Sequence, residues 1–145
     1  MATRRRSSRR PSPNPHGAVT QATVLVVDDE ASVRETIAEV LSLANYPVIP
    51  AANEQEAEEI MQRLGEVGIR LVIVDVYLTS QPQARTGYVL AQRWRAMRPG
   101  LPIILISGDS RNQDLPDVRS GAMHFLLKPF RMEALLEAVQ EALSG

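Results

Sequence analysis

The stretch LVIVDVYLTS (residues 71–80) opens with four consecutive apolar side chains and then places a carboxylate, Asp75. An apolar run of this kind is typical of a strand that is buried on both faces in a parallel sheet. An aspartate is costly to place in such surroundings. Residues 71–74 are therefore predicted to form a central strand, and the charge at its end is a candidate functional group.

Apolar runs and helical patterns alternate along the rest of the chain. The other runs predicted to be strands are 23–27, 46–49, 102–106 and 125–127. Between the runs and after the last one, apolar side chains recur at helical spacing, namely Val33, Ile37, Val40, Leu41 and Ala44; Ala57, Ile60, Met61 and Leu64; Leu90, Trp94 and Met97; and Leu135, Leu136, Val139 and Leu143. Strands that alternate with helices predict an α/β fold, with a parallel sheet covered by helices on both faces.

The fourth helical segment differs from the others. Its sequence, DSRNQDLPDVRSG (109–121), is polar and contains Pro116 in the middle. Proline removes a backbone donor and clashes with the preceding turn of a helix. The helix in this segment is therefore predicted to be short or irregular.

Composition limits the possible classes of function. The chain has 145 residues, 44% of them hydrophobic, and no cysteine, so disulfide frameworks and thiolate metal sites are excluded. No apolar run approaches the roughly 18 residues of a membrane span. The lack of cysteine suits a reducing cytoplasm, which is the expected location. Residues 1–27 contain five arginines and no acid, whereas the remainder has 11 basic and 17 acidic residues. We predict a disordered Arg/Ser/Pro-rich tail at 1–20 and one folded domain at 21–145.

Polar residues follow four of the predicted strands. They are the sequence DDE (28–30), Asp75, the sequence SGD (107–109), and Lys128. In an open parallel sheet, functional sites lie beyond the carboxyl ends of the strands, so these residues are predicted to converge. A capping box, SVRE (32–35), is sufficient to begin the first helix, which leaves Asp28 and Asp29 free for another role.

The chemistry of this set points to phosphoryl transfer. Carboxylate oxygens without histidine or cysteine suit Mg²⁺, with Mn²⁺ as an alternative ion. Lys128 is the only lysine among 16 basic residues, and a compact ammonium suits a tight site for one phosphoryl oxygen. A nucleophilic Asp75, a divalent cation, Lys128 and the hydroxyl of Ser107 would together support transfer of a phosphoryl group to a carboxylate.

Four separated motifs, VLVVDDE (24–30), LVIVD (71–75), LISG (105–108) and FLLKPF (125–130), resemble the receiver domain of bacterial response regulators. The resemblance covers residues 21–145. It implies a flavodoxin-like sheet with strand order 2-1-3-4-5. It also implies a protein that accepts a phosphoryl group from a histidine kinase or a histidine phosphotransfer protein, and that is not a turnover enzyme.

The resemblance also implies roles for individual residues. Asp75 would be the phosphoacceptor, Lys128 would contact the phosphoryl group, Ser107 would move towards it, and Phe125 would be the aromatic switch. The magnesium ligands would be Asp28, Asp29, Asp75 and the backbone carbonyl of Tyr77. The side chains of Tyr77 and Asp109 would tune the rate at which water attacks the acyl phosphate, and the peptide bond before Pro129 would be cis.

Two features depart from the family pattern or leave alternatives open. The loop at 77–86 is about four residues longer than usual, since Gly87 comes twelve residues after Asp75. The sequence DVYLT (75–79) half-matches the Asp-x-Asp-x-Thr motif of haloacid-dehalogenase-type phosphatases, but Tyr77 replaces the second aspartate.

The expected output is a contact with an unidentified downstream protein, or a role as a phosphoryl relay or sink. Because no output domain follows the last helix, a stand-alone receiver that is a monomer or weak dimer is predicted. A regulator that associates with DNA through its arginine-rich tail is the alternative. Membrane contact is not expected, and binding of nucleic acid is the less favoured outcome.

Overall fold

The computed structural model describes residues 23–78 and 84–144. The predicted tail at 1–20 and the middle of the long loop lie outside these residues. The strands are β1 (Thr23–Val27), β2 (Val48–Ala51), β3 (Ile69–Asp75), β4 (Ile103–Ser107) and β5 (His124–Leu127). The helices are α1 (Ala31–Leu43), α2 (Glu54–Gly68), α3 (Thr86–Met97), α4 (Pro116–Arg119) and α5 (Met132–Ser144).

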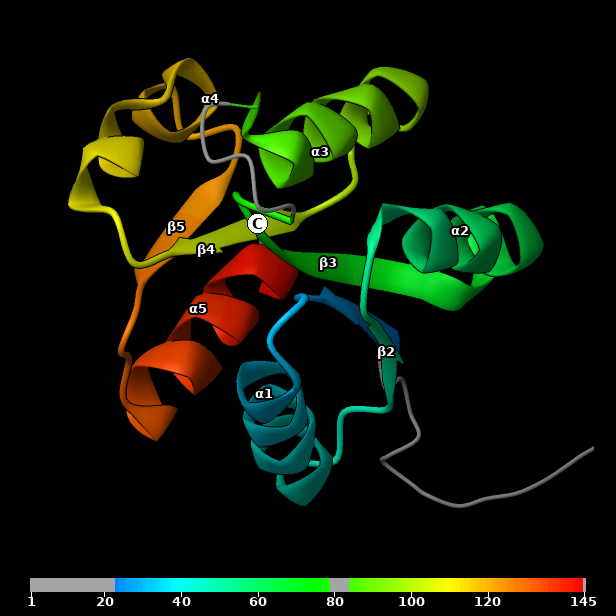
Figure 1. Ribbon diagram of the computed structural model, residues 1–145. Helices are drawn as coiled ribbons and strands as arrows, with labels where there is room; N and C mark the ends of the chain where they lie inside the picture. The colour runs from blue at the N-terminus through cyan, green and yellow to red at the C-terminus, as the bar shows by residue number, and fades with distance from the viewer. Residues whose placement is uncertain (1–22, 79–83, 145) are drawn as a thin grey trace, which may run out of the picture.

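The five strands form one parallel sheet with the order β2-β1-β3-β4-β5. Figure 1 shows α1 and α5 on one face of this sheet and α2, α3 and α4 on the other. Successive side chains of a strand point to opposite faces, so each central strand supplies both cores. In β3, for example, Leu71 and Ile73 pack with α1 and α5, whereas Val72 and Val74 pack with α2 and α3. The predicted fold class, including the strand order, is confirmed.

The fourth helical segment is short, as predicted. A 3-10 helix at Ser110–Asp114 is followed by the four-residue α4, which begins at Pro116. Proline is well tolerated there because the first N–H groups of a helix have no partner within the helix. The hydroxyl of Tyr88 donates a hydrogen bond of 2.7 Å to Asp117 and so attaches α4 to α3.

Several details of the sequence-based prediction were wrong. Strand β2 begins two residues later than expected, because the backbone N–H of Tyr46 still donates to Leu41 at the end of α1. The predicted capping box does not form: α1 begins at Ala31 with Glu30 at the N-cap position, so Ser32 lies inside the helix. Met97 is 72% exposed rather than part of the core.

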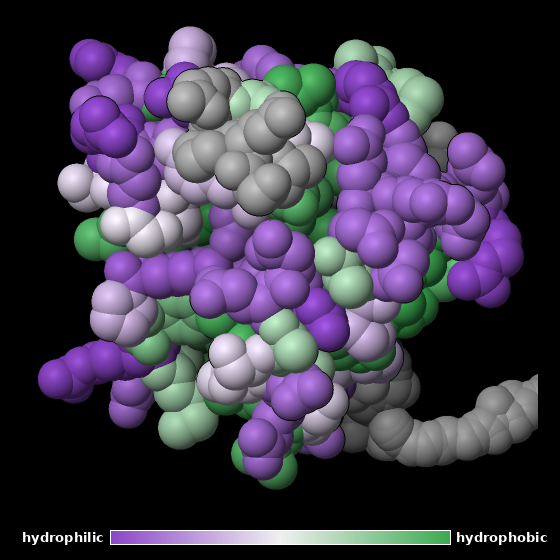
Figure 2. Space-filling view, viewed as in Figure 1, coloured by the Kyte–Doolittle hydropathy of each residue, from purple (hydrophilic) through white to green (hydrophobic). Residues whose placement is uncertain are grey.

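The outward face of α2 is polar. Figure 2 shows hydrophilic side chains over α2, which buries Ala57 and Ile60 against the sheet and exposes Gln55, Glu56 and Glu59. Within 23–78 and 84–144, no helix combines the length and the apolar character that crossing a membrane would require.

Candidate functional site

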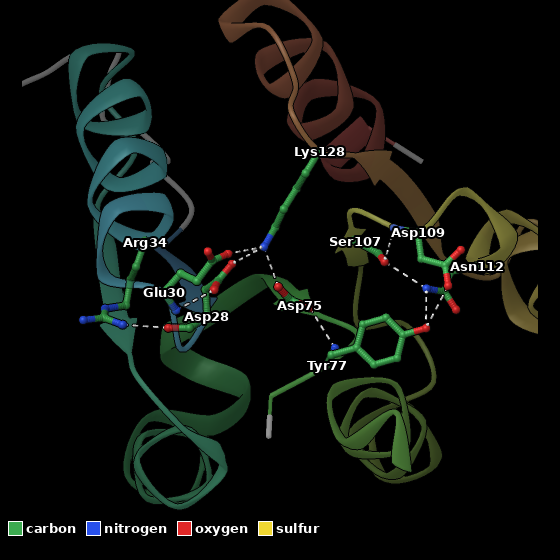
Figure 3. A network of polar contacts seen from close by, with 9 residues as sticks. All are labelled: Asp28, Glu30, Arg34, Asp75, Tyr77, Ser107, Asp109, Asn112 and Lys128. Atoms are coloured by element: carbon green, nitrogen blue, oxygen red, sulfur yellow. Dashed lines mark hydrogen bonds and ion pairs between the residues drawn. The ribbon is translucent and has the colours of Figure 1, made fainter. Parts of the chain in front are cut away.

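The ammonium group of Lys128 lies among three carboxylates at the carboxyl ends of β1, β3 and β5 (Figure 3). Its Nζ is 2.5 Å from Asp75 Oδ2, 3.1 Å from Glu30 Oε1 and 3.2 Å from Asp28 Oδ2. Burial lowers the pKa of Lys128, but the hydrogen bond and the charge of Asp75 raise it by more, so the pKa lies above its usual value. The side chain is therefore a permanent cation at the centre of the acids.

Asp75 uses both of its carboxylate oxygens. Oδ2 accepts from Lys128, and Oδ1 accepts a 2.7 Å hydrogen bond from the backbone N–H of Tyr77. The residue is only 6% exposed. These contacts hold the carboxylate at the end of β3 in one orientation, which suits a nucleophile that must meet its substrate in line.

The long loop after β3 is closed at its base, next to Asp75. The N–H of Gly87 donates to the carbonyl of Val76 at 2.9 Å. A Cβ atom on Gly87 would lie 1.7 Å from the carbonyl oxygen of Asp75, so only glycine allows α3 to approach β3 this closely. The extra residues of the loop thus come between Val76 and Gly87 and leave the base of the site intact.

Asp28 is fully buried, and its environment disfavours its charge. Oδ1 accepts a 2.9 Å hydrogen bond from the N–H of Glu30, and the guanidinium of Arg34 donates to the backbone carbonyl of Asp28 at 2.7 Å. Burial raises the pKa of Asp28 to about 6, and the negative charge of Asp75 adds to the rise. Although Oδ2 is paired by charge with Lys128, it has no hydrogen bond within the described residues.

The acids of this site fit a divalent cation. One oxygen each from Asp28, Glu30 and Asp75 lie within 4.8 Å of one another, and the buried Oδ2 of Asp28 is free of hydrogen bonds in the part of the chain described. Hard oxygen donors of this kind suit Mg²⁺. Asp29, predicted as a ligand, is exposed at the same turn and is not among these three acids, whereas Glu30 was not assigned a role from the sequence.

A second polar network lies on the other side of Asp75 (Figure 3). Ser107 Oγ accepts hydrogen bonds of 2.9 Å from the backbone N–H of Asp109 and from Asn112 Nδ2. Asn112 Nδ2 also donates to the Tyr77 hydroxyl at 3.1 Å, and that hydroxyl donates to Asp109 Oδ2 at 3.4 Å. Hydrogen bonds from Arg111 lower the pKa of Asp109 to about 2. The carboxylate of Asp109, on the outer side of the site, is therefore charged at any physiological pH.

The structure thus places most of the predicted residues around Asp75. Lys128, Asp28, Ser107, Tyr77 and Asp109 converge there, and Phe125 lies on β5, half-buried against the core shared with α2 and α3. The backbone N–H of Lys128 donates to the carbonyl of Ser107 at 2.8 Å, and the Lys128–Pro129 peptide bond is cis. Besides Glu30, sequence reasoning missed Asn112, which is buried within a polar segment that has no apolar period.

Comparison with known proteins agrees with this arrangement. The family model of the response regulator receiver domain matches residues 24–140. The chain is 38% identical over 127 residues to the sensor kinase CckA of Brucella abortus and 32% identical over 130 residues to a probable transcriptional regulator, ycf27, of Porphyridium aerugineum. Each match covers 84% of this chain, but only 12% and 51% of those two relatives.

Two solved structures match this chain along nearly their whole length. A receiver domain protein from Clostridium thermocellum superposes with a TM-score of 0.73 at 25% identity, covering 85% of this chain and 94% of that one. The chemotaxis protein CheY4 of Vibrio cholerae superposes with a TM-score of 0.71 at 29% identity, covering 86% and 100% respectively.

Proposed function

Because the chain belongs to the response regulator receiver domain family, we propose that it accepts a phosphoryl group on Asp75 from a phosphorylated histidine. Receiver domains are phosphoacceptors and not turnover enzymes, which removes the phosphatase alternative. The observation that carries the proposal is the contact of Asp75 with Lys128, beside the carboxylates of Asp28 and Glu30. The donor is a histidine kinase or a histidine phosphotransfer protein.

In the proposed reaction, a carboxylate oxygen of Asp75 attacks the phosphorus atom of a phosphohistidine. A bond forms between that oxygen and phosphorus while the phosphorus–nitrogen bond breaks, and the leaving imidazole keeps the electron pair. Protonation of the phosphoimidazole beforehand lets it leave as neutral histidine. Lys128 offsets the negative charge on the phosphoryl oxygens as donor and acceptor approach.

The residues that would hold a magnesium ion are Asp28, Asp75, Asp29 and the backbone carbonyl of Tyr77, with Glu30 beside them. When bound, such an ion supplies positive charge that gathers and neutralises phosphoryl oxygens. The buried Oδ2 of Asp28, which has no hydrogen bond within the described residues, supports this assignment.

The phosphorylated state is read through a change of surface. A phosphoryl group adds about −1.5 to −2 charges and strong acceptor oxygens. We propose that Ser107 moves towards these oxygens and that Phe125, half-buried on β5, turns inward into the space left behind. A downstream protein with different affinity for the two surfaces reads the change.

The proposal is tested with beryllofluoride, which mimics a phosphoryl group on a carboxylate. Calorimetric titration in Mg²⁺ should show saturable binding to the wild type and none to Asp75→Asn, which keeps the shape of the side chain. Asp114→Asn, the same chemical change at an exposed position outside the site, serves as the matched control and should still bind. Equal binding by Asp75→Asn would show that another residue is the acceptor.

A further inference from the structure

Asn112 is a buried polar residue that the reaction described above does not use. It lies in the 3-10 helix Ser110–Asp114 and is fully buried. Its Oδ1 is buried without a hydrogen-bond partner within the described residues. An unpaired buried amide oxygen costs free energy, so an apolar side chain of the same shape would serve packing better. The amide nitrogen does have hydrogen-bond partners, and we infer that these explain why an asparagine occupies this position.

That nitrogen holds the hydroxyl group of Ser107. Ser107 Oγ accepts from Asn112 Nδ2 and from the N–H of Asp109, both at 2.9 Å, so both of its acceptor positions are filled. The two donors lie on the segment that follows β4, whereas Asp75 ends β3. Movement of Ser107 towards a phosphoryl group on Asp75 must therefore break its hydrogen bond with Asn112.

The same nitrogen also donates to the hydroxyl of Tyr77, two residues after Asp75. Asn112 thus joins the residue that is to move with the residue that lies beside the phosphoacceptor. Figure 3 shows these three side chains in one group, which the backbone N–H of Tyr77 joins to Asp75.

Building on the proposed function, we propose that Asn112 is a positioning residue that holds Ser107 in its resting place and so sets how readily the phosphorylated state forms. Loss of this one hydrogen bond should favour the phosphorylated state by the net free energy of a typical protein hydrogen bond. This corresponds to a factor of about 2 to 12 in the equilibrium constant between the resting and the phosphorylated state. Asn112 therefore opposes activation through Ser107, without itself touching the phosphoryl group.

The test is the dissociation constant of beryllofluoride in saturating Mg²⁺, measured by calorimetry. Asn112→Leu is close in shape and lacks the amide, and it should bind about 2- to 12-fold more tightly than the wild type. Gln113→Leu, an exposed position in the same turn, is the matched control and should bind as the wild type does. If the leucine variant does not fold, Asn112→Ala removes the same donor and should shift the constant in the same direction.

A double-mutant cycle shows whether the effect passes through Ser107. In a Ser107→Ala background, Asn112→Leu should leave the dissociation constant unchanged, because there is no hydroxyl left to hold. A merely structural role would instead lower the melting temperature and leave beryllofluoride affinity unchanged.

The outcomes separate the two proposals. Wild type that binds beryllofluoride at Asp75, together with an Asn112→Leu variant of unchanged or weaker affinity, overturns the role of Asn112 alone. An equal change in beryllofluoride affinity on Asn112→Leu in the wild-type and Ser107→Ala backgrounds also overturns the role of Asn112 alone. Wild type that does not bind overturns the proposed function, and the inference with it.

Discussion

Replacement of Asp28 by asparagine should stabilise the protein in the absence of metal, although it removes an ion pair with Lys128. Asp28 is fully buried beside Asp75, and burial is the main reason that its pKa rises from 3.8 to about 6. The pKa already includes the attraction of Lys128, so it reports the net cost of the charge. Asparagine keeps a carbonyl oxygen that can accept from the N–H of Glu30.

The magnitude follows from the change in pKa. A rise of about 2 units corresponds to about 3 kcal/mol of unfolding free energy, at 1.36 kcal/mol per unit. We therefore expect a gain of about 1–3 kcal/mol at pH 7, equivalent to roughly 5 °C or more in melting temperature.

The pH dependence has a defined sign. Since the pKa of Asp28 is higher in the folded state, the folded protein binds more protons between about pH 4 and pH 6. This group therefore makes the wild type lose stability as the pH rises through that window. The asparagine variant lacks this loss, so its advantage should be near zero at about pH 3.5 and complete above about pH 6.5.

Urea titrations in a chelator across this pH range measure the effect. Asp29→Asn, which removes the adjacent exposed carboxylate, is the control and should change the unfolding free energy by less than about 0.5 kcal/mol. Added Mg²⁺ should raise the melting temperature of the wild type by linkage and have much less effect on Asp28→Asn. A metal-free Asp28→Asn protein that is less stable than the wild type at pH 7 would refute the view that the buried charge of Asp28 destabilises the metal-free fold.

Three other substitutions test single contacts. Gly87→Ala should cost about 3 kcal/mol of unfolding free energy in thermal or urea unfolding, since its Cβ would clash with the Asp75 carbonyl; a cost below 1 kcal/mol would contradict the close approach. Tyr88→Phe should cost about 1–2 kcal/mol and raise hydrogen exchange in α4, because its 2.7 Å hydrogen bond with Asp117 is lost; unchanged exchange would show that this bond does not hold α4. Lys128→Met should lower metal-free stability by about 3 kcal/mol, since three carboxylates lose their common cation, and Mg²⁺ should recover part of the loss in a melting experiment; full stability without metal would contradict its role.

Much of this fold could be predicted because each strand carries an apolar run and each long helix an apolar stripe. The convergence of Asp28, Asp75, Ser107 and Lys128 follows from the rule that parallel strands end at one edge of the sheet. The strand order came from the resemblance to a family and was confirmed by the structure.

The remaining features depend on contacts between distant parts of the chain. Asn112 lies in a polar segment, and its burial depends on Tyr77, which is 35 residues earlier. The role of Glu30 depends on Lys128, 98 residues later. The capping box at Ser32 does not form because the N-cap of α1 is Glu30, two residues earlier than the sequence pattern suggested.

The central claim is that Asp75 carries the phosphoryl group, and the most direct measurement is to locate that group on the chain. The protein should be incubated with acetyl phosphate and Mg²⁺, treated with borohydride to convert an acyl phosphate into a stable alcohol, and sequenced by mass spectrometry. The account predicts that Asp75 alone is reduced and that Asp75→Asn yields no reduced residue. Reduction at Asp28, Asp29 or another acid in the wild type, with Asp75 unmodified, would contradict it.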